Sequence, residues 1–175
     1  MSLKDEIIEA VKEAGFDEYK EIKTKDIIFD EAVFASCAEN KCGNYGKNHS
    51  CPPLSGNMEE NQARFLSYEN GIIINKIVYY GEFYERYEEA GKEVEDAFNK
   101  LGKLLDGKAV RLIGAGGCRI CKECAALTDE PCRFPDKRRY SMEGSGMDIV
   151  KMSKDLEMTY NGGDNHYGFF MMVIY

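Results

Sequence analysis

The sequence predicts an α/β or α+β fold, in which helices flank a mostly four-stranded sheet and two cysteine-rich loops extend from the strand ends. Three observations predict it. Residues 71–80 and 169–175 are almost continuously apolar, which is typical of strands covered on both faces. Residues 83–105 repeat apolar side chains at helical spacing. The seven cysteines all fall in two segments punctuated by glycine and proline.

The first half of the chain predicts two helices and two strands around a loop. Ser2 and Asp5 form a capping pair before an apolar stripe that ends at Gly15. Partial alternation between Tyr19 and Phe29 predicts a strand over residues 22–29. A long loop at 37–53 and a polar helix near 57–69 then precede the apolar strand at 71–80.

The second half continues the same alternation of helix and strand. A helix beginning near Phe83 ends at Gly107, and a short strand at 109–113 leads into Gly114-Ala115-Gly116-Gly117. This glycine run carries little weight as a nucleotide-binding motif, because no helix can start directly behind it. Ser145 and Asp148 predict the capped start of a helix reaching about Met158, before the final strand at 169–175.

Length and composition indicate one domain over residues 1–175. The chain has 175 residues, of which 43% are hydrophobic, and both values are ordinary for a single globular domain. No stretch is apolar enough to span a bilayer, and residues 1–6 lack the apolar core of a signal peptide, so we expect a cytoplasmic protein. Seven cysteines in such a chain favour thiolates kept reduced for a metal over a disulfide framework.

The net charge of −8 argues against a nucleic-acid or anionic-membrane partner, because both attract positive surfaces. Residues 117–140 differ, with six basic and four acidic side chains and a net charge of +2, which leaves −10 elsewhere. A basic collar of this kind would stabilise the reduced form of an anionic cluster or attract an acidic redox partner protein. A solvated charged loop is the alternative interpretation.

Cys118, Cys121 and Cys124 follow one another at every third residue, and Cys132 comes seven residues further on, before Arg-Phe-Pro. Bacterial iron–sulfur runs share the first three positions but place the fourth cysteine after three residues and before proline. A structural zinc site usually takes its ligands as two separated pairs. The spacing therefore favours an iron–sulfur cluster, with zinc or ordinary thiols as alternatives.

Cys37, Cys42 and Cys51 form a second group of three in the loop before Pro52-Pro53. Such a group could be completed by His49 as a Cys3His zinc site, by another ligand to a cluster, or be left open to a substrate. Alternatively, Cys51 or Cys132 crosses between the two groups, as the fourth cysteine of ferredoxin runs does.

Together the two motifs resemble a family of predicted metal-binding, cysteine-rich proteins of iron–sulfur character found largely in anaerobes. The resemblance rests on the spacing of Cys37, Cys42 and Cys51 around Tyr45-Gly46, on Cys118 to Cys124, on Pro131-Cys132-Arg133-Phe134-Pro135, and on Ser141 to Asp148. It implies metal binding by these cysteines and no particular activity. Tyr45, Arg133 and Asp148 lie in the matched motifs, where they would contact the cofactor or a substrate, or else hold the loops in place.

Three functions follow from these features. The first is an iron–sulfur protein, with one or two 4Fe-4S clusters, that transfers electrons to or from a redox partner protein. The second is an enzyme whose three-cysteine cluster keeps one iron position open. The third is a zinc-stapled interaction module.

Overall fold

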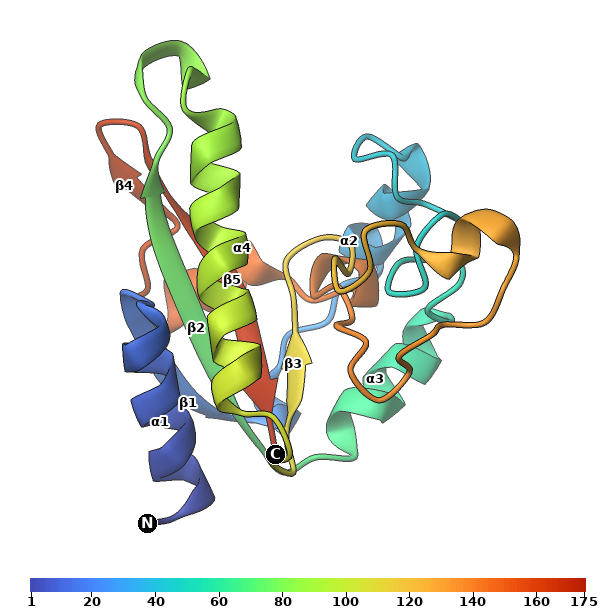
Figure 1. Ribbon diagram of the computed structural model, residues 1–175, viewed down its shortest axis with the longest axis horizontal. Coiled ribbons are helices and arrows are strands. Elements are labelled where there is room, and N and C mark those ends of the chain that lie inside the picture. The colour runs from blue at the N-terminus through green and yellow to red at the C-terminus, as the bar shows by residue number, and fades with distance from the viewer.

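The computed structural model describes residues 1–175 and has an α+β fold with a five-stranded antiparallel sheet (Figure 1). The strand order is β1-β2-β5-β3, and a three-residue strand, β4, pairs with β5. The four strands β1, β2, β5 and β3 correspond to the mostly four-stranded sheet that the sequence predicts. The strands are β1 (Glu18–Lys23), β2 (Asn70–Tyr79), β3 (Arg111–Ile113), β4 (Asn161–Gly163) and β5 (His166–Ile174).

Five α-helices accompany the sheet: α1 (Leu3–Ala14), α2 (Glu31–Ser36), α3 (Met58–Leu66), α4 (Tyr87–Leu104) and α5 (Ile149–Asp155). Figure 1 shows α1 and α4 side by side over the sheet, with α2, α3 and the two cysteine-rich loops gathered beyond β3. No helix is long and apolar enough to cross a membrane.

The two central strands, β2 and β5, are buried on both faces, as their apolar sequences predict. Ile72 and Ile74 pack with α1 and α4 in one core. Their neighbour Ile73 points to the other face and joins a second core with Phe65 of α3 and Met152 of α5. Because successive side chains of a strand alternate between faces, two strands organise both cores.

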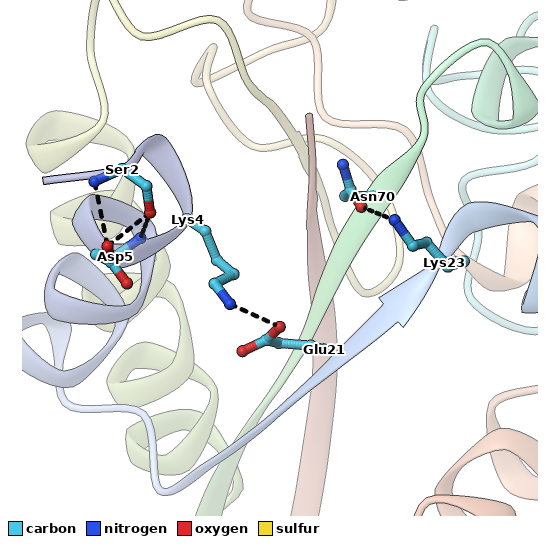
Figure 2. A network of polar contacts seen from close by, with 6 residues as sticks. All are labelled: Ser2, Lys4, Asp5, Glu21, Lys23 and Asn70. Carbon is cyan, nitrogen blue, oxygen red and sulfur yellow. Dashed lines mark hydrogen bonds and ion pairs between the residues drawn. The ribbon is translucent and has the colours of Figure 1, made fainter.

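Helix α1 is capped as the sequence predicts (Figure 2). The Ser2 hydroxyl accepts from the Asp5 backbone N–H, the Asp5 carboxylate accepts from the Ser2 backbone N–H, and Gly15 ends the helix in the left-handed conformation. The ammonium of Lys4 reaches Glu21 on β1 at 3.3 Å. Exposed ion pairs of this kind add little stability. Helix α1 is therefore held against the sheet mainly by the packing of its apolar side chains.

The first strand lies earlier than the alternation predicts, at residues 18–23 instead of 22–29. A 3-10 turn at Thr24–Asp26 ends it, and the buried Thr24 hydroxyl donates to the Tyr68 carbonyl. Beyond that turn, Phe29 forms only an isolated bridge with Met147. Ile27 is still buried, so its apolar side chain packs in the core without belonging to the sheet.

Helix α4 begins at Tyr87, four residues after the predicted start at Phe83. Phe83 and Tyr84 have φ of 54° and 62°, left-handed values that interrupt a right-handed helix. Phe83 is 96% exposed, so the apolar repeat predicted over residues 83–105 does not place it in the core. Helix α5 is capped by Asp148 alone, since the buried Ser145 hydroxyl donates to Ser141 instead. The sequence interpretation also missed α2 and β4.

Candidate metal centre

The two cysteine-rich loops lie against each other, although about 70 residues separate them in the sequence. The Ser50 hydroxyl accepts from the Cys118 backbone N–H at 2.7 Å, and the Asn48 amide donates to the Cys118 carbonyl at 2.9 Å. Asn48 in turn accepts from the backbone and hydroxyl of Ser50. Short polar side chains of the first loop therefore fix the position at which the second loop begins.

Cys118, Cys121, Cys124 and Cys132 all line one small cavity of about 20 Å³. Cys132 thus lies with the other three in spite of its longer spacing, because the 3-10 turn Ala125–Thr128 folds the chain back. All four thiols are partly exposed. We refer to these residues as the four-cysteine group.

His49 belongs to the four-cysteine cavity and does not line the cavity of Cys37, Cys42 and Cys51. Its backbone N–H donates to the Cys124 sulfur at 3.5 Å, and its ring Nε2 donates to the Glu130 carbonyl at 2.8 Å. The structure thus separates His49 from the three-cysteine group that it was considered to complete. Its observed contacts instead hold the two loops together and place a donor on one sulfur.

Two guanidinium groups beside the four-cysteine group have no carboxylate within ion-pair distance. Arg138 lines the cavity and donates to the His49 carbonyl at 3.3 Å, while its buried Nε has no partner. Arg139 is 9% exposed, stacks 4.4 Å from the Phe98 ring centroid and donates to Asn99. Burial lowers the pKa of Arg139, and the nearby Cys118 and Glu95 oppose that effect. A negative centre on these sulfurs would compensate both cations.

Arg133 also borders the four-cysteine cavity, and its observed contacts hold the loop. Its guanidinium donates to the Glu123 carbonyl at 3.0 Å and lies 3.7 Å from the Glu130 carboxylate. These bonds join the segment after Cys132 to the segment between Cys121 and Cys124. Arg133 therefore braces the loop from its exposed side.

Cys37, Cys42 and Cys51 line a different and much larger cavity, of about 1020 Å³, together with Tyr45 and Asp148. We refer to these three as the three-cysteine group. Cys42 is exposed, Cys37 is half-buried and Cys51 is buried. The turns between them use Gly43 and Gly46 at φ of 76° and 69°. The predicted division of the cysteines into four and three therefore matches how the fold arranges them.

Burial raises the pKa of the Cys51 thiol to about 11, and it also raises that of Cys37. The Glu143 carboxylate adds to both shifts. Glu143 accepts from the Gly116 backbone N–H at 3.3 Å and from the Ser141 hydroxyl at 3.2 Å, and it lines the same cavity. Sequence reasoning missed Glu143 as a site residue, because a single glutamate in a matched motif gives no distinguishing signal.

No three His, Cys, Asp or Glu side chains converge closely enough to hold a single metal ion. The cysteines instead surround two cavities as sets of four and three thiols. Thiolates are soft ligands that suit zinc, copper(I) and iron–sulfur clusters, so both donor sets fit metals of that class.

Comparison with known proteins gives one match. A family described as predicted metal-binding protein (DUF2284) matches residues 20–175, which is nearly the whole chain and includes every cysteine. The expected resemblance to a family of predicted metal-binding proteins is therefore confirmed. No curated protein and no solved structure matches the chain.

Proposed function

Since the chain belongs to the predicted metal-binding protein family DUF2284, we propose that it is an iron–sulfur protein that transfers electrons to or from a redox partner protein. Cys118, Cys121, Cys124 and Cys132 would hold the cluster. When bound, such a cluster supplies one-electron redox chemistry at a potential set by nearby charges, hydrogen bonds and solvent.

The observation that carries this proposal is the position of four thiols beside Arg138, a cation that has no carboxylate within ion-pair distance and whose buried Nε has no partner. A thiolate-ligated cluster is anionic, and Arg138 and Arg139 would stabilise its more negative, reduced state. The His49 N–H on Cys124 acts in the same direction, because a hydrogen bond to sulfur draws charge from it. Successive cysteines at every third residue favour a cluster over zinc.

Exposure of the four-cysteine group suits exchange of electrons with a docked protein. The four thiols are partly exposed, and Phe134 and Leu127 beside them are 48% and 56% exposed. Lys122 and Arg133 lie on the same exposed loop. A partner with an acidic rim around an apolar centre would fit this surface.

A second candidate function is favoured by one observation, the large cavity at the three-cysteine group. Three thiolates leave one position of a cluster without a protein ligand, and here that position would face space large enough for a small molecule. The protein would then be an enzyme with an open-site cluster. The two functions are compatible, since the four-cysteine group could supply electrons to such a site.

Metal content of three single variants tests these assignments. Cys121→Ser should lose most of the iron and sulfide of the four-cysteine group, because a serine oxygen is a hard substitute for a thiolate. Cys42→Ala and Cys51→Ala should each lose the metal of the other group and leave the first intact. Unchanged metal in Cys121→Ser would refute the main proposal. Loss in Cys51→Ala without loss in Cys42→Ala would show that Cys51 serves the four-cysteine group instead.

A further inference from the structure

We propose that the large cavity is a docking site for an extended peptide segment of a partner protein, apolar with a basic residue, which adds a strand to the open edge of β5. This inference goes beyond metal binding and electron transfer, because it assigns a surface for protein recognition. In strand addition, backbone hydrogen bonds hold the peptide, and contacts on either side select its side chains.

Strand β5 lacks a neighbour along the middle of one edge. Strand β3 pairs with Met172–Ile174 and β4 pairs with His166–Tyr167, so residues 169–171 have no partner strand on that edge. Residues 168–171 all line the cavity, although their side chains alternate between the two faces of the sheet. The cavity therefore borders the edge of β5 itself, at the position that a further strand would occupy.

The backbone of Phe170 presents an unpaired donor and acceptor to this gap. Asn70 and Tyr175 exchange backbone hydrogen bonds of 3.1 and 3.0 Å, so odd-numbered residues of β5 bond to β2 and even-numbered residues point to the opposite edge. On that edge, the Gly168 N–H donates to the Tyr160 carbonyl at 3.0 Å. Phe170 comes next in the alternation, faces no strand, and makes no backbone hydrogen bond with a turn or loop. Since Phe170 is only 3% exposed, its free N–H and C=O favour an added partner.

Apolar side chains cover both sides of the gap, as they do for the central strands. Val94 and Phe98 of α4 line the cavity, and so do Met147 and Ile149. Phe98 belongs to the core between α4 and the sheet, whereas Met147 and Ile149 belong to the second core on the other face. An added strand would therefore meet apolar surface on both of its faces, which favours apolar residues at successive positions.

The cavity is long enough for an extended segment. Tyr87 at the start of α4 and Phe98 further along the helix both line it. At 1.5 Å for each helical residue, they are roughly 16 Å apart along the helix axis. A strand rises about 3.3 Å for each residue, so this span accommodates about five residues.

The charges that line the cavity favour a basic residue in the docked segment. The two basic side chains of the lining, Lys92 and Arg119, are already paired with Asp96 and Glu95 respectively. A lysine or arginine of the partner would compensate the remaining carboxylates, whereas an acidic residue would be repelled. Three carboxylates line the cavity with no cation within ion-pair distance: Glu88, Glu143 and Asp148.

Gly91 supplies a way to fill the gap without disturbing the fold. It lies in the interior of α4 and lines the cavity. A Cβ at this position would meet no heavy atom within 4 Å. A phenylalanine here should therefore extend into the space beside β5, while alanine should leave that space open.

The test is calorimetric titration of the anaerobically purified full chain with two sets of acetylated pentapeptide amides. Each peptide carries one charged residue, moved through the five positions, among valine and phenylalanine; that residue is lysine in one set and glutamate in the other. The tightest lysine peptide should bind more tightly than its glutamate counterpart by about tenfold or more. Gly91→Phe should weaken it by a similar factor, and the matched control Gly91→Ala should bind as the wild type does.

Methylation of alternate amide nitrogens distinguishes a strand from any other bound form. The N–H groups of every second residue of a docked strand face β5, and the others face away. The tightest peptide is therefore compared in two forms, one methylated at its second and fourth residues and one at its third and fifth. One form should bind as the parent peptide does, and the other should lose about tenfold or more in affinity.

Three results would overturn the proposal: no binding by any lysine peptide, equal binding of the two methylated forms, or binding that Gly91→Phe leaves unchanged. Analytical ultracentrifugation covers the remaining occupant, a second copy of this chain. A wild-type dimer that Gly91→Phe converts to a monomer would show that the edge of β5 is used for self-association, and it too would overturn the proposal.

Discussion

Arg138 lines the cavity of the four-cysteine group with no carboxylate within ion-pair distance, and Arg139 lies close enough to Cys118 and Glu95 for both to raise its pKa. Such cations are costly in a protein interior unless a negative group lies near, and their attraction for it is strong because solvent screens it poorly. For Arg138, the neighbouring sulfurs are the negative groups available once they are ligated as thiolates.

We predict that Arg138→Gln lowers the reduction potential of the bound cluster. Removing one unit charge about 4–8 Å away should change the interaction energy by about 2–4 kcal/mol at an effective dielectric constant near 20, which corresponds to on the order of 100 mV for one electron. Redox titration measures the shift. Arg86→Gln, which removes the same charge from the exposed start of α4, is the control and should leave the potential unchanged.

Glu18 is the centre of a polar network that is independent of the cysteines. Its carboxylate accepts from Asn75 Nδ2 at 2.8 Å and from the Thr159 N–H and hydroxyl at 2.9 and 2.7 Å. Burial alone would raise the pKa of Glu18, but these hydrogen bonds outweigh it and hold the pKa below its usual value of 4.5. The bonds link β1 and β2 to the segment before β4.

We predict that Glu18→Ala lowers the free energy of unfolding by about 1 kcal/mol at pH 7, because the Thr159 N–H and hydroxyl lose their acceptor and the buried Asn75 amide loses one of its two acceptors. The stabilisation is present above pH 4.5 and is lost as the pH falls through the lowered pKa, since the unfolded state then binds the extra proton. Urea unfolding at several pH values measures both effects. Glu21→Ala on the same strand removes only an exposed ion pair and should have little effect; equal losses in the two variants would contradict this account.

At the scale of elements, the cysteine-rich loops contain little regular structure. Between α2 and α3 there is one 3-10 turn at Cys37–Glu39, and between β3 and Tyr140 there is another at Ala125–Thr128. Ordering a residue costs about 1–2 kcal/mol of backbone entropy, which these polar stretches cannot recover by burying apolar area. Bound metal would supply the missing free energy.

Limited proteolysis should therefore distinguish the loaded from the stripped protein. Without metal, we expect early cuts within 37–53 and 117–140, while residues 70–113 stay protected because β2 and α4 are packed in the core. With metal, the same loops should resist. Mass spectrometry of the first fragments gives the answer, and identical cutting of both forms would contradict a role for metal in ordering the loops.

Sequence reasoning predicted elements well where many residues share one pattern. The apolar runs of β2 and β5 and the stripe of α4 were located to within a few residues at most boundaries. It failed where a single contact decides the backbone. The turn at Thr24 depends on the Tyr68 carbonyl, 44 positions away. The left-handed Phe83 and Tyr84 have no sequence signature, because bulky residues seldom adopt that conformation.

In the candidate site, too, features set by a sequence pattern were predicted and features set by a single long-range contact were not. Spacing was enough to predict the groups of four and three cysteines, because short loops keep neighbouring thiols close. It could not assign His49, which lies near Cys51 in sequence but contacts Cys124 and Glu130 through the other loop. Nor could it find Glu143, which reaches the three-cysteine group only because Gly114 and Ser141 bridge β3 to the segment after the second loop.

At the scale of the whole molecule, the sheet and its two cores form a frame that carries both cysteine groups at one side (Figure 1). The loops contact each other directly through Asn48, Ser50 and Cys118. Two metal sites on such loops would be neighbours, which suits passage of electrons from the exposed four-cysteine group to a ligand in the large cavity.

The central claim is that this chain holds an iron–sulfur cluster. The most direct test is quantification of iron, acid-labile sulfide and zinc in the anaerobically purified wild-type protein, together with its visible spectrum. The account predicts iron and sulfide in equal amounts, at least one cluster for each chain, and a brown protein whose colour fades on reduction. A colourless protein that contains zinc and no sulfide would contradict it.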